Sequence, residues 1–130
     1  MKTLLFLIAA LLFVGIQTSS AQSSPELAVK FGKHKKDAKS KVSVKFLALV
    51  EDSRCPEGVN CVWAGNAKVS LKVRRSNGAW KTVELNTGLG AQSVTFEGYE
   101  LKLSSLTPSP KAGAPMDRRR YVIKVSIKKL

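Results

Sequence analysis

The chain has 130 residues, with 22 lysines and arginines against 9 acidic residues and a formal net charge of +13. This length suits one domain. The positive charge favours acidic partners. One histidine and two cysteines are too few for the usual ligand sets of structural zinc domains.

Residues 1–21 have the pattern of a secretory signal peptide. Lys2 is followed by an unbroken apolar run over residues 4–16, and small residues lead to a cleavage site after Ala21. The run is shorter than the roughly 20 residues that a membrane-spanning helix needs. We therefore expect residues 22–130 to be a single β domain, exported to the periplasm or outside the cell, without a transmembrane segment.

The mature chain alternates apolar and polar residues with the period of a β-strand. Residues 32–41 are lysine-rich and predict a polar loop, either simply solvated or an anion-binding patch. Asn77-Gly78 predicts a type I′ hairpin turn. The strand at 42–50 is expected to become buried on both sides. The expected strands are residues 27–31, 42–50, 68–74, 80–85, 93–96, 99–104 and 121–129.

About seven short strands separated by turn residues predict an all-β fold, an antiparallel sandwich. An immunoglobulin-like strand order and a small barrel both fit this pattern. Residues 86–90 are a glycine-rich loop without the phosphate-loop motif, and residues 107–117 are a proline-rich loop.

The two cysteines, Cys55 and Cys61, lie between two expected strands. Their spacing and the expected export favour an intra-loop disulfide over metal ligation, for which His34 is the only further soft ligand. Asp52 is expected to cap loop amides or to pair with Arg54. Trp63 is expected to pack over the disulfide or to cap the core. The candidate binding loop comprises Pro56, Glu57, Gly58, Val59, Asn60 and Trp63.

No catalytic group of residues is evident. The single histidine has lysine neighbours, no serine lies in a G-x-S-x-G motif, and each cysteine has a partner. The C-x5-C spacing also differs from the C-x-x-C of dithiol oxidoreductases. The sequence therefore predicts a protein that is not an enzyme and that has no cofactor or metal.

A basic sheet face is the second candidate site. In an immunoglobulin-like order the strands at 68–74, 99–104 and 121–129 share one sheet. Their outward residues are then mostly basic, and this face is predicted to bind anions. Ordinary solvation of an exposed sheet is the alternative. The face comprises Lys68, Lys72, Arg74, Lys102, Lys124 and Lys128, with Arg118, Arg119 and Arg120 at its edge.

The cysteine motif, D-S-R-C-P at 52–56 and C-V-W-A-G at 61–65, resembles a signature of small exported bacterial proteins and lipoproteins of uncharacterised function. A segment like G-Y-E-L-K-L at 98–103, followed by P-x-P at 108–110, accompanies it. The resemblance implies a cell-envelope β-domain. This chain lacks the lipid-attachment cysteine of the lipoprotein members.

These features predict a non-enzymatic, exported cell-envelope domain that binds an anionic component or a protein. One alternative is a secreted enzyme inhibitor that presents the disulfide loop, and another is an unrecognised hydrolase. Nucleic acid is disfavoured, because no aromatic RNA-binding pattern or zinc-finger spacing accompanies the basic charge.

Overall fold

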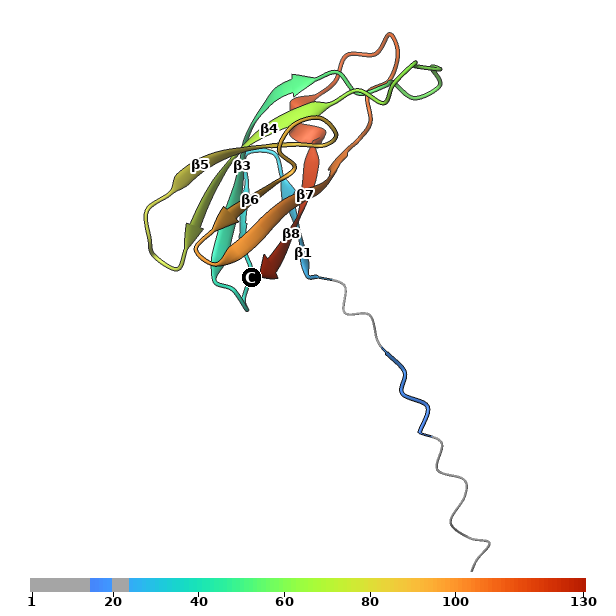
Figure 1. Ribbon diagram of the computed structural model, residues 1–130. Helices are drawn as coiled ribbons and strands as arrows, with labels where there is room; N and C mark the ends of the chain where they lie inside the picture. Colours follow the sequence, from blue (N-terminus) through green and yellow to red (C-terminus); the bar gives the residue numbers. More distant parts are fainter. Residues whose placement is uncertain (1–14, 20–23) are drawn as a thin grey trace, which may run out of the picture.

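The computed structural model describes residues 15–19 and 24–130, and the latter form two antiparallel sheets packed face to face (Figure 1). Most of the predicted signal peptide, residues 1–14 and 20–21, lies outside the described residues. Among the residues that are described, no helix is long and apolar enough to cross a membrane.

Each sheet has four strands, and the strand orders are β1-β8-β7-β6 and β2-β3-β4-β5. The first sheet contains β1 (Glu26–Lys30), β6 (Ser93–Phe96), β7 (Tyr99–Thr107) and β8 (Val122–Lys129). The second contains β2 (His34–Lys36), β3 (Val42–Asp52), β4 (Ala67–Arg75) and β5 (Lys81–Asn86).

The strands follow one another around the sandwich in sequence order. The chain crosses between sheets after β1, where Phe31 donates to the carbonyl of Tyr121 and Gly32 donates to that of Phe46, both at 2.9 Å. It crosses back through the loop between β5 and β6. The predicted antiparallel sandwich is confirmed, but β2 to β5 and β6 to β8 are meanders with β1 beside β8, which is not the immunoglobulin strand order.

The core fills the space between the two sheets. Alternate residues of every long strand point inward because successive side chains of a strand leave on opposite faces. One sheet contributes Val44, Phe46 and Leu71, and the other contributes Leu101 and Ile123, all fully buried. The described strands thus share one continuous hydrophobic core.

The predicted polar loop at 32–41 contains a strand, which brings the total to eight. All three residues of β2 are exposed, so the segment has no apolar alternation that a sequence pattern would reveal. Its pairing with β3 is set by the turn that follows, where Lys41 has a φ of 63° and the Asp37 carboxylate accepts from the Ser40 amide at 2.8 Å.

The expected type I′ turn at Asn77-Gly78 is wrong, because such a turn needs positive φ at both of its central residues and neither Asn77 nor Gly78 has one. The positive φ, 52°, is at Ser76, and the Arg75 carbonyl accepts from the Gly78 amide at 3.0 Å. The turn follows the end of β4, which continues past its pairing with β5 and places Arg75 opposite Val42 of β3.

The end of β3 is also more exposed than expected. Register shifts occur between Phe46 and Ala48 and between Leu49 and Glu51. Leu47 and Val50, the residues inside these shifts, are exposed. A bulge adds one residue to a strand and changes which face the next side chain takes, so the apolar run at this point does not mean burial on both sides.

Candidate binding site

Three loops come together at one end of the sandwich, the end opposite the C-terminus in Figure 1. One of them, residues 53–66, joins β3 to β4 and carries the disulfide. The β7–β8 loop lies beside it, since the Glu57 amide donates to the Pro110 carbonyl at 2.8 Å and Glu57 pairs with Lys111 as an isolated parallel bridge. The β5–β6 loop, residues 87–92, completes this end.

The base of the β3–β4 loop continues the antiparallel pairing of its two strands. Ser53 donates its amide to the Asn66 carbonyl at 2.7 Å, and Cys55 donates to that of Ala64 at 2.9 Å. Gly65 lies opposite Ser53 with a φ of +75°, and a Cβ there would approach the Ser53 carbonyl oxygen to 1.9 Å. Glycine is therefore required at this position for both conformation and space.

Cys55 and Cys61 form the predicted disulfide, with 5.9 Å between their Cα atoms. The bond closes the ring above the hydrogen-bonded base. The loop is consequently held at two levels, by backbone pairing below and by a covalent bond above.

Arg54 ties this loop to the opposite sheet. Its Nε donates to Oδ1 of Asp52 at 2.8 Å and its Nη2 donates to Oδ2 at 2.9 Å, so the expected Asp52–Arg54 pair is bidentate. Nη1 and Nη2 also donate to the carbonyls of Leu106 and Pro108, at 2.6 and 3.0 Å. The Tyr121 hydroxyl donates to Asp52 at 3.3 Å from the start of β8.

The partly buried Asp52 carboxylate is held in its charged form. Burial opposes its ionisation, but the hydrogen bonds and positive charge of Arg54 outweigh burial and hold the pKa of Asp52 below its ordinary value. The pKa of the Tyr121 phenol is raised, first by burial and then by the charge of Asp52. Both shifts keep the cluster as a carboxylate, a guanidinium and a neutral phenol at neutral pH.

Two buried asparagines attach the β5–β6 loop to the same end. Asn66 donates from Nδ2 to Oδ1 of Asn86 at 2.9 Å, and its own Oδ1 accepts from the amides of Gly88 and Leu89 at 3.0 and 3.1 Å. Nδ2 of Asn86 donates to the Ala91 carbonyl at 3.0 Å. These contacts fix the base of the β3–β4 loop against its neighbour.

The outer part of these loops exposes several apolar side chains beside polar ones. Val62 is fully exposed, and the exposed fractions of Trp63, Val59 and Leu89 are 67%, 43% and 55%. We call these side chains the apolar tip. The expectation that Trp63 caps the core is wrong, because most of its side chain is exposed.

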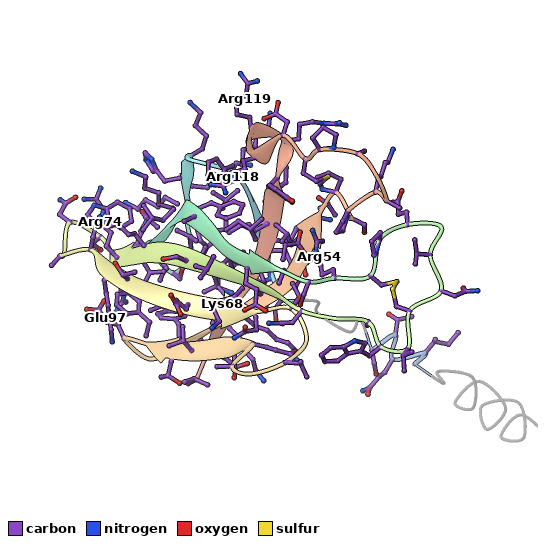
Figure 2. The ribbon with its side chains drawn as sticks, turned by 90° about the horizontal axis from the view of Figure 1, so that it is seen from above. Arg54, Lys68, Arg74, Glu97, Arg118 and Arg119 are labelled. Carbon is purple, nitrogen blue, oxygen red and sulfur yellow. A yellow bond between two sulfur atoms is a disulfide. The ribbon has the colours of Figure 1, made fainter. Side chains whose placement is uncertain are left out.

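The structure divides the predicted basic face between two surfaces. Lys68, Lys72 and Arg74 belong to β4 of one sheet, whereas Lys102, Lys124 and Lys128 belong to β7 and β8 of the other. The prediction fails because it assumed an immunoglobulin-like pairing that the meander order does not have. The residues Arg118–Arg120 form a short 3₁₀ helix before β8, where Arg119 pairs with Asp117 at 3.1 Å (Figure 2).

Cross-strand neighbours distinguish these basic residues from one another. Lys68 lies opposite Glu51, and Lys128 lies opposite Glu100. Lys72, by contrast, lies opposite Lys45. The predicted face thus contains lysines opposite a glutamate as well as one that lies opposite another lysine.

Sequence patterns did not identify Asn66, Asn86 or Tyr121 as part of the site. Asn66 and Asn86 each flank an apolar strand, where a buried amide is hard to tell from a turn residue. Tyr121 resembles a core residue, and it is also buried. Its hydroxyl reaches Asp52 only because β8 and the end of β3 meet across the sandwich.

Within the described part of the chain, no three histidine, cysteine or acidic side chains cluster as metal ligands would. Comparisons with protein-family models, with curated proteins and with solved structures give no match. The likeness of the cysteine motif to exported bacterial proteins therefore stays an expectation from sequence.

Proposed function

We propose that this chain is a non-enzymatic, exported cell-envelope domain that binds a partner protein through its apolar tip. The observation that carries the proposal is the exposure of Val59, Val62 and Trp63 on a loop that is otherwise firmly held. Exposed apolar residues gathered in one place are a recognised feature of interaction sites. Tryptophan in particular is enriched among residues that dominate binding energy.

The way the loop is held supports this function. A mobile loop loses conformational entropy when it binds, and this loss reduces affinity. Here the disulfide, the Asp52–Arg54 pair and the amide contacts of Asn66 already restrict the loop. The apolar side chains are thus presented on a support that needs little further ordering.

Export is supported by the apolar N-terminal run and by the disulfide, since disulfides persist in oxidising compartments. The resemblance of the cysteine motif points to the same compartment. A protein partner is preferred over a purely anionic one for this end of the molecule because the side chains of the tip are apolar and the neighbouring exposed Glu57 is itself negative.

Affinity capture from native envelope extract tests the proposal. Wild type should retain a stoichiometric partner in high salt, and Trp63→Ser and Val62→Ser should each lose most of it. Leu130→Ser is the matched control, since Leu130 is also an exposed apolar residue (64%) but lies at the C-terminus. Equal recovery with all four proteins would contradict the proposal.

Enzyme inhibition is a second candidate, favoured by the exposure of Glu57 and Val59 inside the disulfide ring. An inhibitory loop would use residues 56–60, whereas general partner binding would also use Val62 and Trp63. If Glu57→Ala and Val59→Ala abolish capture of an enzyme while Trp63→Ser does not, the inhibitor is the better description.

A further inference from the structure

We infer that the outer face of the β2-β3-β4-β5 sheet carries a binding site for an acidic polysaccharide, separate from the apolar tip. The site lies at the end of the sheet away from the disulfide, as the position of Arg74 in Figure 2 shows. It is formed by basic residues of three strands and by a tryptophan. We call it the basic cluster, and it comprises His34, Lys36, Lys45, Lys72, Arg74 and Trp80.

The strand register places the basic residues in two adjacent rows. His34, Lys45 and Lys72 are direct cross-strand neighbours in one row. In the next outward row, Lys36 and Arg74 lie on either side of Ser43. The intervening row points inward, since its Val44 and Val73 are fully buried, so both basic rows share the outer face.

No carboxylate neutralises these rows. The ion pairs among the described residues are Asp52–Arg54 and Asp117–Arg119, and neither involves the cluster. Lysines directly opposite each other in a sheet repel and lower stability. This arrangement differs from Lys68 and Lys128, each of which lies opposite a glutamate. A concentration of uncompensated charge of this kind raises the local concentration of an anionic ligand.

Trp80 adds a flat apolar surface to the charge. It comes from the β4–β5 connection, and Arg74 stacks on its ring with the guanidinium carbon 4.4 Å from the ring centroid. The His34 ring approaches it edge-on, with 6.4 Å between ring centroids. The indole of Trp80 thus contacts Arg74 of β4 and approaches His34 of the edge strand β2. Trp80 keeps 37% of its surface exposed.

The stacked side chain of Arg74 favours anion binding, because its guanidinium is already held in place by the Trp80 ring. Its Nε is buried without a hydrogen-bond partner in the described structure, and stacking restricts its guanidinium before any ligand arrives. Arginine donates well to planar or tetrahedral anionic groups such as carboxylate and sulfate. An apolar ring face next to several cations suits a sugar chain, which has apolar C–H faces and regularly spaced acidic groups.

Heparin, an acidic polysaccharide, is the probe for this site. At physiological salt, Lys45→Glu/Lys72→Glu should weaken binding to an immobilised short heparin chain by about tenfold or more, and Trp80→Ala by about fivefold. The matched control is Lys102→Glu/Lys124→Glu, which makes the same charge change at exposed positions on the other sheet. It should weaken binding by less than about threefold.

The single variant Lys45→Glu separates loss of binding from loss of folding, which the double variant does not, since changing both lysines gives another like-charge pair. Lys45→Glu replaces a like-charge pair with an opposite-charge pair, so its thermal midpoint should rise while its heparin affinity falls. Equal weakening by the two double variants would overturn the site, since total charge alone would explain it. Tighter binding to single-stranded DNA than to heparin, with the same dependence on Trp80, would overturn the assignment to polysaccharide.

Discussion

Arg54 connects the β3–β4 loop to the ends of β3 and β7 through its guanidinium group. It pairs with Asp52 at the end of β3, and it donates to the carbonyls of Leu106 and Pro108 where β7 ends. The side chains of Arg54 and Asp52 are both only 12% exposed. A partly buried pair of this kind is costly to break from one side, because the remaining charge loses its partner.

Arg54→Ala should lower the free energy of unfolding by about 2–3 kcal/mol, since it removes the charged partner of Asp52 and the side-chain donor to two carbonyls. Urea denaturation measures the change. Arg119→Ala is the control, because Arg119 makes a similar pair with Asp117 at an exposed site and its loss should have little effect. Equal effects of the two substitutions would contradict the role given to Arg54.

The Asp52 carboxylate should make stability depend on pH. Its pKa is lower in the folded chain than the ordinary value of 3.8, so the unfolded chain binds the proton more tightly. The stabilisation is present above pH 3.8 and is lost as the pH falls through the lowered pKa. The difference in unfolding free energy between wild type and Asp52→Asn should therefore be constant near neutrality and shrink below pH 3.8. A difference that does not change down to pH 2 would contradict this linkage.

Single residues differ in how much the sequence reveals about them. Asp52 and Arg54 have opposite charges and are close in the chain, and their pairing was expected and is found. Trp63 was expected to pack over the disulfide or to cap the core, and its 67% exposure excludes the second. No local pattern specifies the left-handed conformation at Gly65 in the same loop or its contact with Ser53.

The β3–β4 loop is an element whose shape depends on two glycines in different ways. Gly65 and Gly58 both have positive φ, +75° and +76°. A Cβ at Gly65 would collide with the backbone of Ser53, while nothing lies within 4 Å of a Cβ at Gly58. The first position is restricted by contact and by conformation, the second by conformation alone.

Gly65→Ala should therefore destabilise the fold by more than about 2 kcal/mol, and Gly58→Ala by about 1 kcal/mol. Chemical denaturation of both variants compares them. A larger loss for Gly58→Ala would show that the base of the loop is less tightly packed than the contacts of Gly65 indicate.

Removing the disulfide should loosen the loop without unfolding the sandwich. The ring is short, so the double variant Cys55→Ser/Cys61→Ser should lose about 2 kcal/mol in the chain-entropy model. Amide exchange should accelerate at residues 55–64 and stay slow in β4, whose inward side chains are buried. Fast exchange throughout β4 would mean that the disulfide supports the whole domain.

At the scale of elements, strands with apolar alternation could be located from the sequence, and β4 and β7 are examples. The strand β2 could not, because all its side chains are exposed and its pairing comes from β3. The bulges in β3 could not be predicted either, since in a run of apolar side chains an added residue does not interrupt the alternation of apolar and polar residues.

The whole molecule presents different chemistry at its two ends. The apolar tip is carried by the loops at one end, and the basic cluster lies toward the other end on one outer face. Alternation specified which residues of a strand share a face, but it did not specify which strands share a sheet. The predicted basic face was therefore divided, and the lysines that do face each other, Lys45 and Lys72, became evident only from the register.

Site-specific photo-crosslinking in the native envelope tests the central proposal, binding through the apolar tip, most directly. A photoreactive residue at Val62 should give a discrete crosslinked species containing one partner protein, and the same residue at Leu130 should give none. Adding free heparin should leave this species unchanged, since the basic cluster is separate. Crosslinks of equal yield from Val62 and Leu130, or none from Val62, would contradict a binding function for the tip.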